Sequence, residues 1–547
     1  MRTAVLLLVY TSVISLGLSQ RFGPMLDSGF ARVLGNRGDA MFIHYGLEHT
    51  WQSVSNPEYC GSLFSPPCFF PERHTLWYSE HLLGVALIYW ALRLVLPFDV
   101  AYQGWQIVLE LLNFAAFALV IRWLRGPHAL AILGGYLWAF SLVNIDQSKQ
   151  PVMIARFAMV LAVYHAWQFV LGLGLTPANC SRHLNRMLAA VFLQGITGLY
   201  TGWFLVMGLA TFLLLAVSLQ PGGWRKLYAF AWSHSARVKL IVVGWLGALA
   251  LAYIPYYVVN WGMSRSYTDC IASLPTPEAW LACVPGTVWD STVGPLREKS
   301  PPECWLFCGF GLDALMLLGV VSTLERLVRR KWRPDSGLVL AALLTAAVWV
   351  LLTLNMGPDD FSLWKGVRVI PGATAIRIIG RVHNVVYLFG ILGGLMWLAR
   401  VTESLRPSVR DGVVGLVAIV CIAEQFGYTP PSFKQREFYP IADRTAAELR
   451  KGDIGYVIPR YTDSDGVAVT EPVFGEVMGM WCGLRANVPV VNGYGSRVPD
   501  ATFLGVVFAN DAERPQRLRE WLHGKFRGKV AIVNPDNLNA TEVIVIE

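Results

Sequence analysis

Charged residues are scarce in this chain, at 15% of its 547 residues, whereas 54% are hydrophobic. Soluble domains carry about 25% charged residues, so the composition excludes an ordinary soluble enzyme and predicts an α-helical polytopic membrane protein. The net charge is +8, but no long run of basic residues is present. The basic residues lie in short stretches between apolar segments, which is typical of membrane orientation signals, and we therefore expect no nucleic-acid partner.

Several motifs that mark other protein classes are missing from the sequence. No compact pair of CxxC motifs is present, which argues against a structural zinc site, and no glycine-rich phosphate loop follows a strand, which argues against a nucleotide-sugar enzyme. The apolar segments contain few acids, chiefly Glu110, Asp313 and Glu424, and no two halves of the chain look alike. A transporter would favour ionisable residues near the membrane midplane and repeated halves, so transport is the weaker interpretation.

Apolar runs long enough to cross a bilayer, roughly 17–25 residues, recur through the chain. Residues 1–19 read as an N-terminal membrane anchor, with a cleaved signal peptide as the alternative. The remaining runs form a transmembrane domain over 103–428. Together with the anchor they predict about eleven transmembrane helices, at 103–124, 128–145, 152–174, 187–199, 201–219, 239–260, 305–322, 337–355, 380–400 and 412–428.

The basic loops set the orientation of these spans, since such loops are normally cytoplasmic. The loops in question are RWLRGPH, CSRHLNR, WRKLYAFAWSHSARVK, ERLVRRKWR and RVTESLRPSVR. All five lie inside only if the apolar stretch 81–98 does not cross the membrane, so we expect an interfacial or re-entrant helix there. The N-terminus is then cytoplasmic, and four segments lie outside together, namely 20–102, 260–304, 356–379 and the tail 429–547.

Five cysteines fall in two of these outer segments. Cys60 and Cys68 lie in the first, and Cys270, Cys283 and Cys304 lie in the second. Outside the cytoplasm such cysteines can persist as disulfides, while the spacing leaves the pairing open. Disulfides within these segments are therefore a prediction.

The tail changes character after Pro430, where short alternating stretches replace the long apolar runs. The stretches DIGYVIPRY, GVAVTEPVFGEV, VPVVNGYG and KVAIVNP with TEVIVIE predict strands, and DAERPQRLREWLHGKF predicts an amphipathic helix. A region of about 115 residues is large enough to hold its own core. We predict a small extracytoplasmic α/β domain over 429–547, in which Asn492-Gly493 marks a turn.

The first outer segment concentrates ionisable residues in the stretch GNRGDAMFIHYGLEHTW. The stretch suits a short helix that begins near Asp39, and an Asp at that position is explained equally well as a helix cap. Glu48 is the second acid and lies nine residues further on, about half a turn out of phase unless the helix breaks at Gly46. His44, Glu48 and His49 are a weaker alternative as metal ligands, since Glu48 also suits an ion-paired helix position.

Further polar residues flank the membrane on the same side. The stretch FFPERHTLWYSEHLLG places Glu80 and His81 in front of the interfacial helix. Arg offers a planar fork that fits a phosphate, and Lys offers a compact charge, so clustered cations predict an anion site; snorkelling at the membrane boundary is the alternative. The third outer segment and the span after it supply four such cations, Lys365, Arg368, Arg377 and Arg381.

These stretches together resemble multispanning glycosyltransferases of the GT-C superfamily, and in appearance YfhO-like and lipopolysaccharide-core-transferase-like bacterial membrane proteins. The likeness rests on GD, YGLEH and CFFPERHTLWYSEHLLG in the first outer segment, followed in order by LWAFSLVNIDQSKQ, LQGITGLYTGWF, IPGATAIRIIGRVHN and PVVNGYG. It covers most of the chain. It departs from the pattern at MFIH and at NGYGSR, where members often carry an Asn pair and NGYSG.

The resemblance implies an inverting transferase at the extracytoplasmic face of a bacterial plasma membrane. Such an enzyme passes a sugar from a polyprenyl-phosphate lipid to a glycan, lipid or protein acceptor. Asp39 matches the catalytic carboxylate of the superfamily, and Glu48 is the reserve candidate. The substrate-binding candidates are His44, Glu80, His81, Lys365, Arg368, Arg377 and Arg381, with the last two placed at the leaving phosphate.

Some features stay open under this interpretation. Members of the superfamily differ in whether they use a divalent metal, so a metal cofactor is neither required nor excluded. The alternative functions are a non-catalytic envelope protein that binds a glycan or a lipid, and a transporter of lipid-linked sugars.

Overall fold

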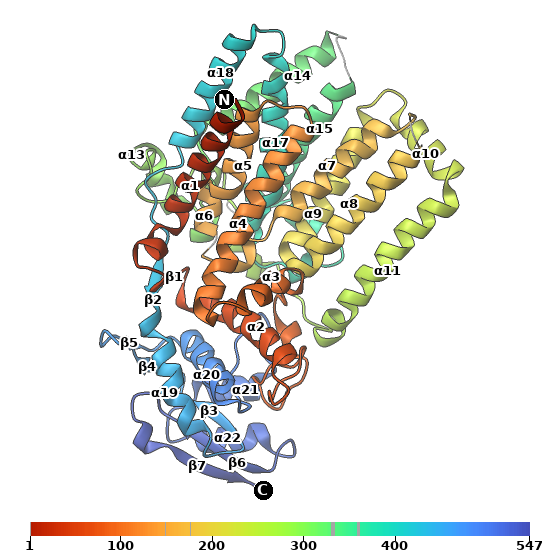
Figure 1. Ribbon diagram of the computed structural model, residues 1–547. Coiled ribbons are helices and arrows are strands. Elements are labelled where there is room, and N and C mark those ends of the chain that lie inside the picture. The colour runs from red at the N-terminus through yellow and green to blue at the C-terminus, as the bar shows by residue number, and fades with distance from the viewer. Residues whose placement is uncertain (1, 148, 176, 330–333, 358–360) are drawn as a thin grey trace.

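The computed structural model describes residues 2–147, 149–175, 177–329, 334–357 and 361–547 as a helical bundle with a mixed α/β region at one end (Figure 1). Eight helical segments in these ranges are long and apolar enough to cross a membrane, which indicates an integral membrane protein. They are formed by α1 (Arg2–Asp27), α4 (Phe98–Trp123), α5 (His128–Phe140) with α6 (Leu142–Gln147), α7 (Phe157–Gly172), α9 (Leu199–Ser218), α11 (Ser235–Val259), α15 (Pro334–Thr353) and α17 (His383–Val401).

Three further helices coincide with the remaining predicted spans but do not match the length and apolarity of the eight. The prediction of about eleven spans is therefore supported for eight of them. The predicted run 187–199 is also shorter than the helix found there. That helix begins with the polar stretch PANCSRHLNR, which a hydropathy pattern leaves out. The three helices are α8 (Pro177–Thr197), α14 (Phe310–Val328) and α18 (Pro407–Ala423), and all run along the bundle (Figure 1).

The apolar stretch 81–98 forms a short helix that is not among the eight candidate spans, and its place at the membrane interface stays a prediction. Its helix α3 (Leu83–Arg93) has 11 residues, which corresponds to a length of about 16 Å, roughly half of a hydrocarbon core. Pro97 then caps the start of α4. α3 packs against α4 and against α2 (Arg37–Ser55) at the end of the bundle that faces the tail (Figure 1).

The tail contains a mixed three-stranded sheet, as the prediction of a small α/β region requires. The strand order is β3-β6-β7, in which β3 (Ile454–Val457) is parallel to β6 (Gly528–Val533) and β6 is antiparallel to β7 (Glu542–Ile546). The tail also holds four helices, α19 (Tyr439–Leu449), α20 (Pro472–Ala486), α21 (Ala501–Phe508) and α22 (Arg514–Leu522). The last of these confirms the predicted amphipathic helix.

Two of the predicted tail strands are wrong. GVAVTEPVFGEV contributes only the two-residue β5 (Ala468–Val469), which pairs with β4 (Tyr461–Thr462), before the chain enters α20 at Pro472. Because α20 is buried on nearly all sides, it has no polar stripe to reveal a helical period. VPVVNGYG forms a single parallel bridge, between Val490 and Gly455.

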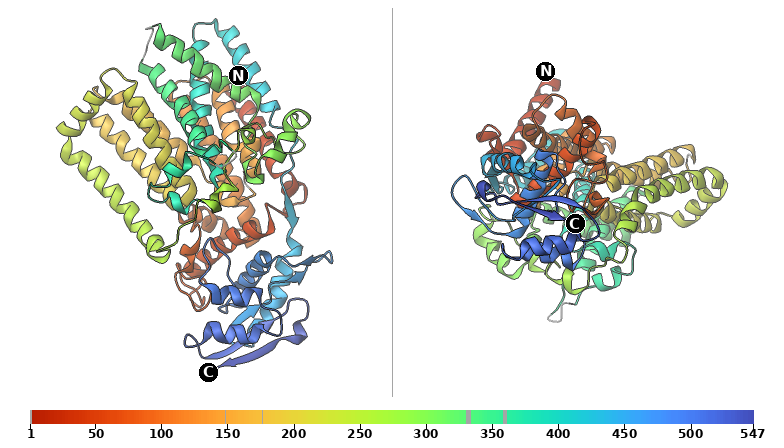
Figure 2. Two further views of the ribbon diagram at one scale, coloured as in Figure 1. Left: turned by 180° about the vertical axis from the view of Figure 1, so that it is seen from behind. Right: turned by 90° about the horizontal axis from the view of Figure 1, so that it is seen from below.

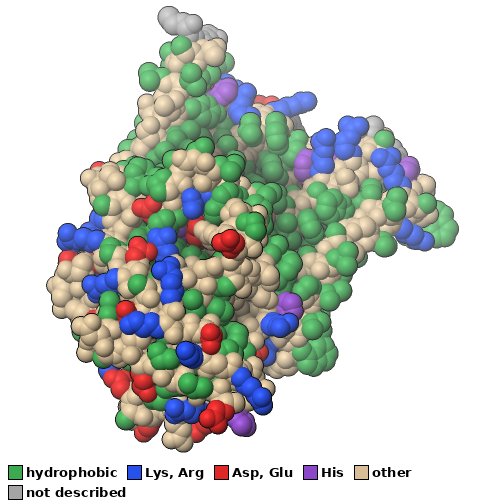
Figure 3. Space-filling model, turned by 60° about the horizontal axis from the view of Figure 1, so that its bottom comes forward, with side chains coloured by type: hydrophobic (Ala, Val, Ile, Leu, Met, Phe, Trp, Pro, Cys, Tyr) green, Lys and Arg blue, Asp and Glu red, His purple; other side chains and the backbone are tan. Residues whose placement is uncertain are grey.

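The tail is docked onto the first outer segment through a shared hydrophobic core. β1 (Arg32–Leu34) pairs antiparallel with β2 (Ser432–Lys434), and the indole N–H of Trp481 donates to the carbonyl of Met41 at 2.9 Å. The tail therefore sits below α2, at the end of the bundle away from the N-terminus (Figure 2). Charged side chains gather over this end, whereas hydrophobic side chains dominate the helices behind it (Figure 3).

All nine cysteines are free thiols, so the predicted disulfides in the outer segments are not formed in this structure. Cys270 and Cys304 are buried, and their Sγ atoms contact the backbone carbonyls of Ile376 and Ser273 at 3.3 Å. Buried thiols of this kind act as small apolar side chains.

Candidate active site

Asp39 lies in the first turn of α2, but it is not the helix cap. Asn36 occupies that position, and its Oδ1 accepts the backbone N–H of Asp39 at 2.6 Å. The side-chain amide of Asn36 also donates to Asp39 Oδ2 at 3.0 Å. Because Asn36 satisfies the cap, the capping explanation no longer accounts for the carboxylate of Asp39. Its other oxygen, Oδ1, accepts from the hydroxyl of Tyr494 at 3.3 Å.

A cavity of about 240 Å³ opens beside Asp39, and all four outer segments contribute to it. The first segment supplies Asp39 and Glu80, and the second and third supply arginines and one further carboxylate. The tail supplies Tyr494 and the two residues after it. The polar side chains that line the cavity are Asp39, Ser79, Glu80, Gln150, Tyr200, Arg265, Glu303, Arg377, Arg381, Tyr494 and Ser496.

Three arginines give the cavity a cationic side. Arg381 is buried; it donates to Oε1 of Gln150, and its guanidinium lies 4.3 Å from the ring centre of Tyr200. Arg377 is more exposed, and its backbone N–H donates to the Tyr200 hydroxyl at 3.2 Å. Arg265 donates to the carbonyl of Ser496 at 2.8 Å. Guanidinium groups gathered in this way match the oxygens of a phosphate.

Glu80 organises the wall on which Arg381 stacks. Its carboxylate accepts the backbone N–H groups of Leu199 and Tyr200 (the latter at 3.3 Å), the first residues of α9, and so satisfies free donors at that helix end. Burial raises the pKa of Glu80, while the Leu199 amide and Arg381 oppose the shift. Glu80 thus fixes the position of Tyr200 under the guanidinium of Arg381.

The tail residue Tyr494 is held in the cavity by a buried carboxylate. Glu476 of α20 accepts the backbone N–H of Gly493 at 2.8 Å and the side-chain amide of Asn492 at 3.2 Å. Burial raises the pKa of Glu476 to about 7. The Tyr494 ring packs edge-on against Phe42 at 5.1 Å, and burial raises the pKa of its hydroxyl, which keeps it a hydrogen-bond donor to Asp39.

An apolar groove of about 590 Å³ continues from the cavity along the bundle. Its walls come from α8, α9 and α11, and it shares five residues with the cavity: Ser79, Glu80, Tyr200, Arg265 and Ser496. α11 packs against α8 but buries none of its residues, and it runs at the outside of the bundle (Figures 1 and 2). The apolar lining includes Val191, Leu199, Trp203, Leu249, Tyr253 and Ile376.

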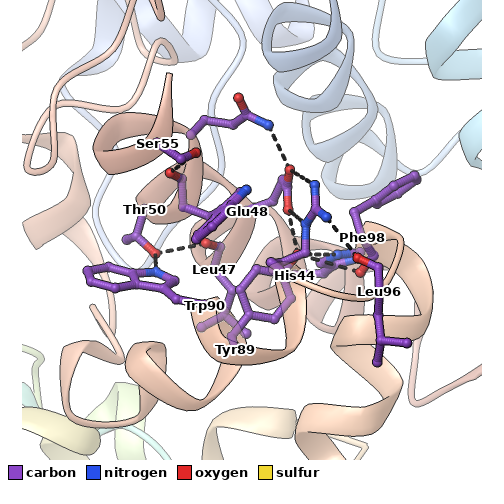
Figure 4. Close-up of polar contacts among 12 residues, drawn as sticks. His44, Leu47, Glu48, Thr50, Ser55, Tyr89, Trp90, Leu96 and Phe98 are labelled. Carbon is purple, nitrogen blue, oxygen red and sulfur yellow. Dashed lines mark hydrogen bonds and ion pairs between the residues drawn. The ribbon is translucent and has the colours of Figure 1, made fainter. Parts of the chain in front are cut away.

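The other half of α2 does not reach the cavity. Glu48 accepts the Nε of Arg93 at 2.8 Å and the hydroxyl of Tyr89 at 2.5 Å, and Nη2 of the same Arg93 reaches its second oxygen at 3.2 Å (Figure 4). His44 is fully buried, stacks on Tyr102 at 4.4 Å, and contacts the Tyr439 hydroxyl at 2.7 Å. Burial, together with nearby arginines, lowers the pKa of His44 well below its usual value. Glu48 and His44, both predicted as site residues, therefore connect α2 to neighbouring elements and do not line the cavity.

Three more predicted residues lie outside the cavity lining. His81 is buried against Trp77, and burial lowers its pKa to about 4. Lys365 lies 4.8 Å from the ring centre of Tyr267, which suits a membrane-boundary contact. Arg368 donates to the backbone carbonyl of Arg265 and so supports the cavity indirectly. Asp39, Glu80, Arg377 and Arg381 are the predicted residues that the structure brings together.

Sequence reasoning missed several lining residues, chiefly Gln150, Tyr200, Arg265, Glu303 and Tyr494. Three of them fall in stretches that carry the GT-C resemblance, namely Gln150 in LWAFSLVNIDQSKQ, Tyr200 in LQGITGLYTGWF and Tyr494 in PVVNGYG, and that was the one signal available. Tyr494 is separated from Asp39 by 455 residues, so no local pattern could have paired them.

The described ranges contain no group of three or more His, Cys, Asp or Glu side chains placed to hold a metal ion. The carboxylates of the cavity lie instead among guanidinium, amide and hydroxyl groups. His49, one of the residues weighed as a ligand, contacts the Tyr59 hydroxyl at 3.0 Å. The residues described therefore do not fit a divalent metal.

Comparisons with known proteins show the fold. No protein-family model and no curated protein matches the chain. The apo oligosaccharyltransferase of Archaeoglobus fulgidus is similar over 96% of this chain and 69% of its own, with 11% identity and a TM-score of 0.50. ArnT from Cupriavidus metallidurans follows in its apo state (12% identity, 97% and 92% covered, TM-score 0.45) and bound to undecaprenyl phosphate (11%, 97% and 93%, 0.38). The chain is thus similar in fold to the Archaeoglobus fulgidus oligosaccharyltransferase.

Proposed function

We propose that this protein transfers a sugar from a polyprenyl-phosphate donor to an acceptor on the extracytoplasmic face of the membrane. The observation that carries the proposal is the junction of two spaces. A polar cavity that holds Asp39 and three arginines opens into an apolar groove between membrane helices. A substrate that fits both spaces has an anionic head and a long hydrocarbon chain. A glycan, lipid or protein hydroxyl is the corresponding acceptor.

The arginines account for binding of the donor phosphate. Arg265 lines both the cavity and the groove, and Arg381 and Arg377 line the cavity. A phosphate at the junction would accept hydrogen bonds from these groups while its polyprenyl chain lies between α9 and α11. Burial strengthens such charged hydrogen bonds, because water competes less for the guanidinium.

Asp39 acts as the general base in the proposed reaction. It takes the proton from the acceptor hydroxyl as that oxygen forms a bond to the anomeric carbon of the sugar. The bond between this carbon and the phosphate oxygen breaks, and its electron pair stays on the phosphate, where the arginines stabilise the added charge. Attack from the face opposite the phosphate inverts the anomeric centre.

The orientation follows from charge. The basic stretches at the end of α4, at the start of α8 and in α10 (Gly223–Ser233) lie at the end of the bundle away from the tail (Figure 1). Basic loops favour the cytoplasm, so the tail and the cavity belong outside. In a bacterial plasma membrane this places the reaction where lipid-linked sugars meet envelope acceptors.

The test compares wild type with Asp39→Asn. Each purified protein receives a panel of labelled polyprenyl-phosphate sugars with envelope extract as acceptor, and label transfer is followed. Loss of a general base lowers the rate by about 10²–10⁴-fold. Asp27→Asn is the matched control, because Asp27 is an exposed acid outside the cavity lining, at the end of α1.

Transfer by wild type and by Asp27→Asn that disappears in a folded Asp39→Asn protein supports the function and the base together. Equal transfer by all three proteins would remove Asp39 from the mechanism. Absence of transfer by wild type with every donor, in an extract that supports a known transferase, would contradict the proposed function.

A further inference from the structure

A second carboxylate in the cavity has no part in the reaction above. Glu303 lies in a 3₁₀ turn (Pro302–Cys304) at the end of the second outer segment and lines the cavity together with Asp39. Its Oε2 is buried and has no hydrogen-bond partner among the described residues. A buried acceptor without a partner costs free energy, which a ligand that donates to it would recover.

The neighbouring charged groups have partners in the protein, although the Nε of Arg381 is buried without one among the described residues. Glu80 accepts two backbone amides, Arg381 donates to Gln150, and Asp39 accepts from Asn36 and from the tail. The backbone carbonyl of Glu303 accepts a hydrogen bond from the side-chain amide of Gln147 at 3.2 Å. The turn is thereby fixed, while the carboxylate is left for a substrate.

Glu303 also lies next to the predicted phosphate site. Its backbone packs against Gly380, where an added Cβ would approach the Glu303 carbonyl oxygen to 2.8 Å. The next residue is Arg381, whose guanidinium we assign to the donor phosphate. The group joined directly to that phosphate is the sugar, so the Glu303 side chain faces the space that the sugar would fill.

We propose that Glu303 binds the transferred sugar by accepting a hydrogen bond from one of its hydroxyl groups or from an amino substituent. This inference rests on the proposed function and specifies the donor further: the sugar carries a hydrogen-bond donor on the side that meets Glu303. Sugars that lack that group leave the carboxylate unpaired and bind less tightly.

The experiment measures equilibrium binding, not turnover. Wild type and Glu303→Gln in detergent are titrated with undecaprenyl phosphate and with a panel of undecaprenyl-phosphate sugars, both neutral and amino sugars. The wild type binds at least one sugar-bearing lipid more tightly than the bare lipid. In Glu303→Gln this preference falls by about 10-fold for a hydroxyl contact and by about 100-fold for an ammonium contact, because Gln keeps an acceptor but loses the charge.

Glu298→Gln is the matched control, since Glu298 is exposed in the same segment and lies outside the cavity lining. Affinity for bare undecaprenyl phosphate stays within about twofold in both variants. An unchanged preference for the sugar in Glu303→Gln, or an equal loss for bare and sugar-bearing lipid, overturns the inference while Asp39-dependent transfer would still stand. If wild type binds neither lipid, the proposed function fails as well.

Discussion

The two halves of α2 each carry a carboxylate, and the two carboxylates have different surroundings. Asp39, in the first turn, lines a cavity among arginines, whereas Glu48 is held by two of the three guanidinium nitrogens of Arg93 and by Tyr89. The helix is continuous from Arg37 to Ser55, so nine residues place the two carboxylates on opposite faces. One face meets the cavity and the other meets α3. An acid in an outer segment is therefore a catalytic candidate only when its helical phase directs it to the cavity.

The contrast also separates two uses of arginine. Arg93 forms an ion pair with Glu48. Arg381 instead donates to the neutral side chain of Gln150 and lies over the ring of Tyr200. A guanidinium that is not neutralised by a carboxylate keeps its charge for an anionic ligand. The cavity thus keeps a cationic side at these arginines, although its lining contains as many carboxylates (Asp39, Glu80 and Glu303) as guanidinium groups.

Glu48→Gln tests the ion pair between α2 and α3, and it has the largest expected effect on stability. The change leaves Arg93 without its carboxylate partner. Loss of one member of a buried pair costs about 3–5 kcal/mol, and we expect about 3 kcal/mol because Arg93 is 17% exposed. Thermal unfolding in detergent measures the loss. Transfer per folded molecule stays within about twofold of wild type; a loss comparable to that of Asp39→Asn would place Glu48 in the chemistry.

Glu476 offers a pH test of the support behind Tyr494. Its pKa is raised from 4.5 to about 7 in the folded protein, so the stability it contributes is complete below about 4.5 and is lost as pH rises through about 7. Between pH 5.5 and 7 this amounts to about 2 kcal/mol. The melting temperature of wild type should fall over that range more than that of Glu476→Gln. Parallel pH profiles for the two proteins would contradict the assignment.

Arg381→Gln tests the anion site on the other side of the cavity. Removal of a charged hydrogen-bond donor should weaken binding of undecaprenyl phosphate by about 10- to 30-fold, and a transferase should show the same factor in its KM for the donor. Lys365→Gln is the comparison, because Lys365 packs on Tyr267 outside the cavity lining. An equal loss in both variants would indicate long-range attraction by surface charge instead of a defined site.

Tyr494→Phe has the smallest expected effect. It keeps the ring against Phe42 but removes the hydroxyl that donates to Asp39 at 3.3 Å. Because that bond is long, we expect kcat to fall only about threefold, with an unchanged melting temperature. A fall as large as that of Asp39→Asn would make Tyr494 a participant in proton transfer and not a positioning residue.

Much of the fold could be read from local patterns. Hydropathy located the eight apolar segments, and charge between them gave the orientation that we propose. A span at 81–98 would place some of the basic loops outside, so the sequence predicted a helix there that does not cross the membrane, and α3 is the short helix found in that stretch. Where the local pattern was ambiguous, as in the buried helix α20, the prediction failed, because an apolar element buried on every side shows neither a helical nor a strand period.

The sequence by itself determined that this is a membrane protein with acids and arginines concentrated at one boundary, and it named Asp39, Glu80, Arg377 and Arg381. Only the tertiary structure decided that these four line one cavity and that Glu48 does not. Glu48 is paired with Arg93, which lies 45 residues further along the chain, so no local pattern could reveal the pair. It also added Tyr494 and Glu303 from distant segments. The physical reason is that composition and periodicity indicate whether a side chain faces water, lipid or the protein core. A site depends instead on contacts between segments that are far apart in the sequence.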